Sequence, residues 1–246
     1  MNLSTLFRLE ENLHLDKKSL VNLRWIAIVG QLITVNFVYY YFKLELPIIE
    51  AHIIILLGLI TNVVLQFRIK TNQLKDLYAA SFLVYDLLQL TFLLYLTGGI
   101  TNPFSLLMIV PSIVSSTFLS MGTTIILGTL TIISLSFLTE YHKILPGLDL
   151  YSFNFPEYYL EGILTSIVIG LVFLSYVGIR FSGETKKRSM ALDKLQQVMA
   201  KEHELDSLGG LAAAAAHSLG TPLATISVVA KELKKEIGTK SKHSKD

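Results

Sequence analysis

The sequence predicts an all-α fold in which a bundle of six transmembrane helices is followed by a cytoplasmic coiled-coil and dimerisation helix. Charged residues make up only 16% of the 246 residues and hydrophobic residues 52%, whereas charged residues are roughly 25% of an average soluble domain. Six apolar runs are each near the roughly 20 residues that a helix needs to cross a bilayer. Because lipid offers no hydrogen-bond partner to an open backbone, these runs are expected to be helices.

Composition also excludes several classes of function. The net charge of +2 is too small to indicate nucleic-acid binding, so no direct contact with nucleic acid is expected. The chain contains no cysteine, which excludes disulfides, zinc–thiolate sites and thiol redox switches, and no metal site is predicted. Residues 1–23 are mixed and charged. They predict a short amphipathic segment on the membrane surface rather than a cleavable signal peptide.

The predicted transmembrane domain covers residues 24–181. Its six spans are placed at residues 24–42, 48–67, 78–97, 104–120, 123–140 and 159–181. Only Met121 and Gly122 separate the fourth span from the fifth. A single helix over residues 104–140 would far exceed the thickness of a bilayer, so these two residues predict a tight helical hairpin.

Basic residues predict the orientation of the spans. With six crossings, three basic groups fall on one side of the membrane: before the first span, between the second and third, and after the sixth. These residues are Arg8, Lys17, Lys18, Arg24, Arg68, Lys70, Lys75, Arg180, Lys186, Lys187 and Arg188. The other side carries Lys43 and Lys143 together with several acids. By the positive-inside rule, both termini are expected in the cytoplasm.

Ionisable residues are scarce within the spans, and Asp86 lies near the middle of the third, one turn before Gln89. A carboxylate at that depth is costly unless it is neutral or paired, which makes Asp86 a candidate functional residue. The structural alternative is a buried acid that bonds to a neighbouring helix, for example to Gln31 or Asn36. The sequence leaves both interpretations open.

The predicted outer turn between the third and fourth spans reads GGITNPF and carries no charge. Gly98 and Gly99 can end a helix because they adopt left-handed backbone easily. Asn102 is a good helix cap, and Pro103 suits the first helical position that follows. Local chemistry alone therefore predicts a well-formed helix–turn–helix corner.

The same turn has a functional interpretation. Uncovered glycine amides and the Asn102 amide could donate hydrogen bonds to a carbonyl headgroup at the membrane surface. Phe104 and Tyr95 could stack on a ring. No basic residue is present for an anionic ligand, so these features favour a quinone over a sugar or an ion.

Residues 182–208 are polar but keep a narrow apolar seam at three-to-four spacing, which is typical of a dimeric coiled coil. The seam residues are Leu192, Leu195, Val198, Met199, Leu205 and Leu208. This connector predicts a homodimer. A helix that leaves the sixth span without a break could also transmit a shift or a rotation.

Residues 209–238 are predicted to form one helix of a dimerisation domain, followed by a polar tail at 239–246. Gly209 and Gly210 are poor helix formers and predict a hinge at its start. An alanine run then leaves His217 accessible to a partner domain. Pro222 has no backbone N–H for the carbonyl of Ser218, so a bend is expected one turn after the histidine. The remaining histidines are expected to have no chemical role; they are His14, His52, His142, His203 and His243.

The pattern His217-x-Leu219-x-Thr221-Pro222-Leu223, on a dimeric helix below a membrane domain, resembles the phosphoacceptor H-box of sensor histidine kinases. More narrowly, the chain resembles the RegB/PrrB-type redox-sensing membrane histidine kinases. Gly220, where most such kinases have arginine, and the upstream GGITNPF segment carry this narrower resemblance. The resemblance covers essentially the whole chain.

The resemblance implies a two-component system in a bacterial inner membrane, in contact with membrane lipid. His217 would accept the γ-phosphoryl group of ATP and pass it to an aspartate of a response regulator. The turn would bind ubiquinone and report the respiratory redox state. Its implied quinone-binding residues are Gly98, Gly99, Asn102, Pro103 and Phe104.

The chain departs from the family pattern at two places. Ser218 stands where an acid usually follows the phosphoacceptor, and a serine cannot supply that negative charge. The sequence also ends at residue 246 without the family's second dimerisation helix or ATP-binding domain. ATP and Mg²⁺ would therefore act only through a domain outside this chain, which is expected to be inactive alone.

Two other functions are compatible with the sequence. One is a catalytically inactive quinone-binding and dimerising membrane module that modulates a full-length kinase, an interpretation that Ser218 favours. The other is a small transporter. It is less favoured, because only Asp86 and a few amides would line a polar path, and because it leaves the coiled coil and the H-box pattern unexplained.

Overall fold

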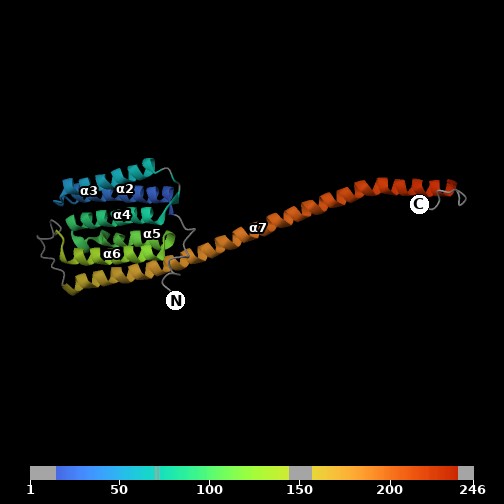
Figure 1. Ribbon diagram of the computed structural model, residues 1–246. Coiled ribbons are helices and arrows are strands. Elements are labelled where there is room, and N and C mark those ends of the chain that lie inside the picture. The colour runs from blue at the N-terminus through green and yellow to red at the C-terminus, as the bar shows by residue number, and fades with distance from the viewer. Residues whose placement is uncertain (1–14, 70, 72, 144–156, 238–246) are drawn as a thin grey trace. The chain divides into compact units, whose positions relative to one another are not determined.

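The computed structural model describes residues 15–69, 71, 73–143 and 157–237. They form helices almost throughout, which confirms the all-α prediction (Figure 1). The long helices are α2 (Lys17–Tyr41), α3 (Ile48–Arg68), α4 (Asp76–Leu96), α5 (Val110–Phe118), α6 (Met121–Glu140) and α7 (Glu157–Ile237). Two 3₁₀ helices, η1 (Gly99–Thr101) and η2 (Pro103–Ile109), connect α4 to α5. Two-residue strands, β1 (Leu15–Asp16) and β2 (Gln73–Leu74), form an antiparallel pair that the sequence did not predict.

Five of the predicted spans each overlap one long helix, and the fourth overlaps η2 and α5. Among the described residues, five helices are long and apolar enough to cross a membrane. The fourth predicted span corresponds to the shorter apolar segment Pro103–Phe118, which combines seven residues of η2 with nine of α5. Because a 3₁₀ helix rises about 2.0 Å per residue and an α-helix about 1.5 Å, this segment is about 28 Å long. That length approaches the roughly 30 Å of a hydrocarbon core.

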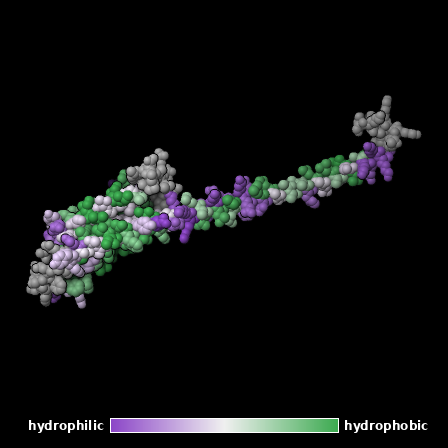
Figure 2. Space-filling view, turned by 90° about the horizontal axis from the view of Figure 1, so that it is seen from below, coloured by the Kyte–Doolittle hydropathy of each residue, from purple (hydrophilic) through white to green (hydrophobic). Residues whose placement is uncertain are grey.

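Apolar side chains cover much of the visible face of the helix bundle (Figure 2). Many are large and exposed, for example Ile26, Ile49 and Phe67. In water such a surface would be unfavourable, whereas in lipid it is the expected exterior of a membrane protein. Inside the bundle, Leu87, Met108 and Leu135 are fully buried, and Ile167 and Leu171 of α7 pack against the same core. The first part of α7 is thus held in the bundle by apolar packing.

The chain divides into two compact units, Met1–Thr185 and Lys186–Asp246, so α7 contributes to both. In the second unit the described side chains after Lys186 are exposed, including the predicted seam. The coiled coil therefore stays a prediction. The predicted interruption at Gly209 and Gly210 is wrong, because α7 continues through both glycines. Each glycine costs roughly 1 kcal/mol relative to alanine, and the alanine-rich segment that follows favours the helix.

Two predicted boundaries differ from the structure. Helix α2 begins at Lys17, seven residues before the predicted start of the first span. Lys17 Nζ donates to the carbonyls of Gln66 (3.3 Å) and Ile69 (2.7 Å), so it covers free carbonyl groups at the end of α3. Residues 1–14 of the predicted amphipathic segment lie outside the described residues.

The predicted hairpin between α5 and α6 exists, but its turn lies at residues 119–120. Ser120 caps α6 by accepting a hydrogen bond from the backbone N–H of Thr123, at 3.1 Å. The carboxylate of Asp76, at the start of α4, accepts from the backbone N–H of Ser120 and from the hydroxyl of Thr123. Met121 and Gly122 therefore belong to the first turn of α6, because the Ser120 cap starts the helix at Met121, two residues before the predicted span.

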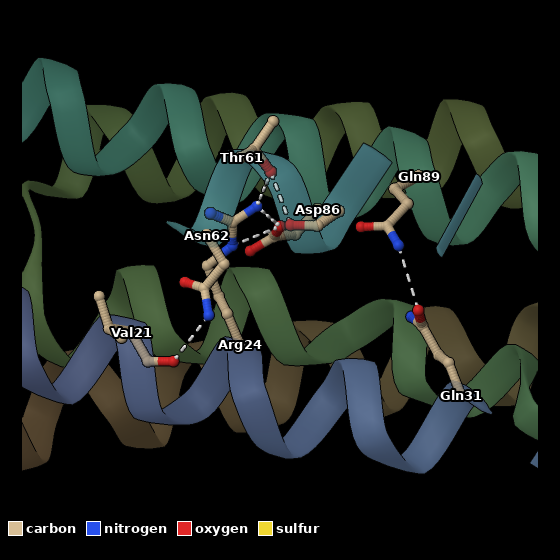
Figure 3. Close-up of polar contacts among 8 residues, drawn as sticks. Val21, Arg24, Gln31, Thr61, Asn62, Asp86 and Gln89 are labelled. Atoms are coloured by element: carbon tan, nitrogen blue, oxygen red, sulfur yellow. Dashed lines mark hydrogen bonds and ion pairs between the residues drawn. The ribbon is translucent and has the colours of Figure 1, made fainter. Parts of the chain in front are cut away.

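A buried ion pair joins three helices (Figure 3). Arg24 of α2 is 4% exposed, and its Nη2 atom lies 2.8 Å from Asp86 Oδ1 of α4. The Nε atom of Arg24 donates to the same oxygen at 2.9 Å, and Nη2 also donates to the hydroxyl of Thr61 in α3 at 2.8 Å. A charge in hydrocarbon is tolerated when it is paired in this way.

The predicted partners of Asp86 were wrong. Gln31 instead accepts a hydrogen bond from Gln89, and Asn36 donates to the carbonyl of Leu32 within its own helix. Arg24 was assigned to the cytoplasmic basic group, but it lies inside α2. The other basic residues of that group are unaffected by this change, so the predicted orientation does not depend on Arg24.

Helix α7 also approaches α5 closely. A Cβ atom at Gly178 would collide with the side chain of Ser116 and would lie 3.3 Å from the Thr117 hydroxyl. Gly170, two turns earlier in α7, has open space around its Cα atom. Glycine is therefore required at the first of these positions for packing and not at the second.

We expect Gly178→Val to lower the free energy of unfolding by about 1–3 kcal/mol, because the added atoms overpack the α5–α7 contact. Thermal unfolding in detergent measures the change. Gly170→Val is the matched control and should change the unfolding midpoint little. Equal midpoints for the two variants would contradict the close packing of α7 on α5.

Single replacements in the ion pair, Arg24→Met or Asp86→Leu, should each destabilise the bundle by about 3–5 kcal/mol, because one charge is left buried alone. The double variant should recover most of this loss, since an apolar pair has no charge to neutralise. Denaturant unfolding in detergent measures the stability of the unmodified chain, the two single variants and the double variant, which completes a double-mutant cycle. Additive losses in the double variant would argue against a direct pair.

Candidate functional site

A cavity of about 600 Å³ lies in the membrane unit between α2 and the segment formed by α4, η2 and α5. It brings together the predicted outer turn and the predicted intramembrane acid. Its polar lining residues are Arg24, Gln31, Thr34, Asp86, Gln89, Thr97 and Asn102. Residues that are far apart in the sequence thus share one site, which makes this cavity the candidate ligand site.

The GGITNPF turn at one end of the cavity has the backbone that the sequence predicted. Gly98 and Gly99 have φ values of 107° and 59°, a left-handed conformation that ends α4. Asn102 Oδ1 accepts a hydrogen bond from the backbone N–H of Phe104 at 2.9 Å, and Pro103 follows as the first residue of η2. The predicted asparagine cap and proline start are therefore confirmed.

Not all of the predicted turn residues reach the cavity. Asn102, Pro103 and Phe104 line it, whereas Gly99 lies against His142 and the carbonyl of Leu138. A Cβ atom at Gly99 would collide with His142. Gly98 and Gly99 therefore shape the turn and are not among the residues that line the cavity.

The side chain of Asn102 is already engaged. Its Nδ2 atom donates to the carbonyl and to the hydroxyl of Thr97, at 2.8 and 2.9 Å. The hydroxyl of Thr97 in turn donates to the carbonyl of Leu93 at 2.8 Å. The amide nitrogen of Asn102 thus donates twice within the turn and helps to close it.

Tyr95, which was expected to stack on a ligand ring with Phe104, does not line the cavity. Its ring stacks on Phe137 with a centroid distance of 6.2 Å. Its carbonyl accepts a hydrogen bond from the backbone N–H of Lys143 at 2.9 Å. Tyr95 therefore joins α4 to α6 and to the segment after α6.

The inner part of the cavity contains polar residues that the site prediction missed. Gln89 is 8% exposed, and its Nε2 atom donates to Gln31 Oε1 at 3.1 Å (Figure 3). Arg24 and Gln31 are seven residues apart in α2, and Asp86 and Gln89 are three apart in α4. These spacings place each pair on one face of its helix. Polar residues at helical spacing within an apolar run are the signal that would have indicated this face.

The mouth of the cavity is apolar. Leu23, Ile26, Leu107 and Val110 line it, and their exposed fractions lie between 42% and 71%. In a membrane these side chains face the hydrocarbon, so the cavity opens sideways to lipid. A molecule dissolved in the bilayer could enter without crossing water.

His217 lies on α7 in the second unit, where it is exposed. Its neighbours on the same face are small, and a shallow groove there is lined by Ala216, Gly220, Thr221 and Ala224. The hydroxyl of Thr221 lies 3.4 Å from the carbonyl of His217, as a donor. The imidazole is therefore accessible to a partner.

The other predicted H-box residues are exposed on the same helix. They are Ser218, Leu219, Gly220, Thr221, Pro222 and Leu223. Pro222 lies inside α7, which continues for fifteen further residues to Ile237. Leu219 and Leu223 are large apolar side chains with nothing packed on them in this unit, and such residues usually mark a protein interface.

Comparison with known proteins agrees with the helical architecture. The profile of the PilS-like transmembrane domain matches residues 12–189. The chain is also similar to the sensor histidine kinase RegB of Cereibacter sphaeroides, in two records of that protein. In each, 39% of 221 aligned residues are identical, covering 89% of this chain and 48% of the relative.

The chain thus spans about half the length of the curated relatives that it matches. No solved structure is significantly similar to it. The family match, the apolar helices and the RegB similarity together describe a multi-pass membrane protein. They also agree with the RegB/PrrB-type resemblance drawn from the H-box and the GGITNPF turn. The chain belongs to the family with a PilS-like transmembrane domain, and it is similar to a membrane sensor histidine kinase.

Proposed function

We propose that this chain is the sensing and phosphoacceptor part of a redox-responsive sensor histidine kinase in a two-component system. In this proposal the membrane cavity binds ubiquinone, and His217 carries the phosphoryl group to a response regulator. The observation that carries it is the cavity itself. Asn102, Pro103 and Phe104 line one lipid-facing site together with intramembrane polar residues.

The cavity favours a neutral, lipid-soluble ligand. Its one cation, Arg24, is neutralised by Asp86 at 2.8 Å, so the lining carries no net charge for an anion. Its walls are otherwise mostly apolar, and its remaining polar groups are amides and hydroxyls. An apolar site with a few hydrogen-bonding groups suits an amphiphile with a carbonyl-bearing ring, which is the chemistry of ubiquinone.

The proposed phosphotransfer uses His217 as a nucleophile. An imidazole nitrogen attacks the γ-phosphorus of ATP, the bond to the bridging oxygen breaks, and ADP leaves. A carboxylate oxygen of the response regulator then attacks the same phosphorus, and the phosphorus–nitrogen bond breaks. Such transfers depend on positioning and charge neutralisation by ATP-bound Mg²⁺, which an ATP-binding domain would supply.

The proposed setting is a bacterial inner membrane with both termini in the cytoplasm. Arg68 and Lys75 flank the α3–α4 connection, and Lys17 and Lys18 begin α2 at the same end. This basic end would face the cytoplasm. The exposed apolar seam of α7 would pair with a second copy of the chain, which gives a homodimer.

Ser218 supports one alternative, in which the chain is a catalytically inactive module that binds quinone and modulates a full-length kinase. A serine cannot supply the negative charge that usually follows the phosphoacceptor. In that case the cavity would keep its ligand while His217 would not be phosphorylated. The two experiments below separate these functions.

We expect His217 to be labelled when the full chain, in nanodiscs, is incubated with the separately expressed ATP-binding domain of a related sensor kinase and γ-labelled ATP. The label should be lost in His217→Gln and kept in His203→Gln, an exposed histidine of the same helix. Absence of label on the unmodified chain, or label that persists in His217→Gln, contradicts the phosphoacceptor role.

Phe104→Ala should weaken the binding of a short-chain ubiquinone about 2- to 10-fold, because one aromatic wall of the cavity is removed. Equilibrium binding to the chain in nanodiscs measures the change. Phe92→Ala is the matched control, since Phe92 is exposed on α4 and does not line the cavity. No binding to the unmodified chain, or equal loss in both variants, argues against this quinone site.

A further inference from the structure

The hydrogen-bond donor for a ligand in the cavity does not lie at the outer turn. The Nδ2 atom of Asn102 already donates to the carbonyl and the hydroxyl of Thr97, and the Thr97 hydroxyl donates to the carbonyl of Leu93. Pro103 has no N–H, and the backbone N–H of Phe104 is held by Asn102 Oδ1. The turn can therefore offer apolar contact to a ligand, but its polar groups close the turn itself.

A free amide donor lines the cavity on α2, at Gln31. Its Oε1 atom accepts from Gln89, and no hydrogen bond of its Nε2 atom occurs among the described residues. Among the described residues, two polar side-chain atoms are inaccessible and have no hydrogen-bond partner: Arg24 Nη1 and Asn62 Oδ1. The Nε2 atom of Gln31 is not one of them, so this nitrogen is accessible, and Gln31 lines the cavity.

Gln89 holds Gln31 in this orientation. Gln89 is itself 8% exposed, and its amide lies against Gly58 of α3. A Cβ atom at Gly58 would be only 2.6 Å from the amide nitrogen and oxygen of Gln89. Glycine at position 58 therefore makes the space in which the Gln89 amide can point at Gln31.

An unpaired amide donor inside a lipid-facing cavity is unfavourable, since a buried donor without a partner costs about 1–3 kcal/mol. A ligand that brings a carbonyl oxygen removes this cost, whereas a purely apolar chain or lipid tail does not. The neighbouring charges do not compete for the donor, because Arg24 and Asp86 neutralise each other. The site therefore selects for a hydrogen-bond acceptor without charge.

We propose that Gln31, held by Gln89, donates the hydrogen bond that recognises a ring carbonyl of the ligand, while the outer turn supplies apolar contact. This inference rests on the proposed quinone function and assigns its specificity to α2 and α4. Asn102 then stabilises the conformation of the turn, whereas Gln31 binds the ligand directly.

The test compares binding of a short-chain ubiquinone to the full chain in nanodiscs. Gln31→Leu should weaken binding about 2- to 13-fold, the equivalent of one net hydrogen bond. Gly58→Ala, which keeps every amide but displaces Gln89, should weaken binding in the same direction. Gln66→Leu is the control: Gln66 lies on α3, accepts from Trp25 Nε1, and does not line the cavity.

The unfolding midpoint of each variant is measured in parallel, so that loss of fold is separated from loss of the donor. Gln31→Leu should lower its midpoint, because it leaves the nearly buried Gln89 amide without its acceptor, and Asn102→Ala should lower it as well; binding is therefore measured well below the lowest midpoint. Wild-type affinity in Gln31→Leu, with the Phe104→Ala loss still present, overturns this inference and leaves the quinone site standing. Absence of ubiquinone binding to the unmodified chain overturns both. Binding that falls only as the midpoint falls overturns the assignment of the donor.

Discussion

The membrane unit depends on one electrostatic constraint: a positive charge in the bilayer must be neutralised by a partner. Arg24 meets this constraint through Asp86 and adds a bond to Thr61, so the pair joins α2, α3 and α4. A buried pair of this kind contributes little net stability, but it strongly disfavours arrangements that separate its members. It therefore favours the placement of α2 beside α4 that leaves the cavity between them.

Apolar contact with a ligand and hydrogen bonding to it, which the sequence analysis assigned to one turn, fall to two different parts of the cavity. The turn is built from residues whose polar groups are satisfied by one another, as in the contact of Asn102 with Thr97. Such a turn is rigid because each buried polar group already has its partner. The unsatisfied amide lies instead on α2, beside Gln89. A rigid apolar end and a polar inner end together suit an elongated amphiphile.

Local features of the fold could be predicted from the sequence, because they depend on neighbouring residues. The apolar runs gave the helices, and the Asn102–Pro103 cap follows from the turn itself. The partner of Asp86 could not be predicted, because Arg24 is 62 residues away and also fits a cytoplasmic basic group. The predicted helix interruption at Gly209 and Gly210 was wrong for a related reason: local propensity is weak, and the surrounding helix overrides it. Gly99 lies against His142 and does not line the cavity, and no local pattern relates these two residues.

The 3₁₀ geometry of η2 has a consequence for the cavity wall. With three residues per turn, side chains three apart lie directly above one another, whereas in an α-helix the same row would rotate by about 60° at every step. Phe104, Leu107 and Val110 follow this spacing, and all three line the cavity. They form a straight row of apolar side chains that begins at the turn and ends where α5 starts. If this segment were α-helical, the row of side chains would turn away from α2. The 3₁₀ geometry therefore gives the site a straight wall along which a linear chain can lie.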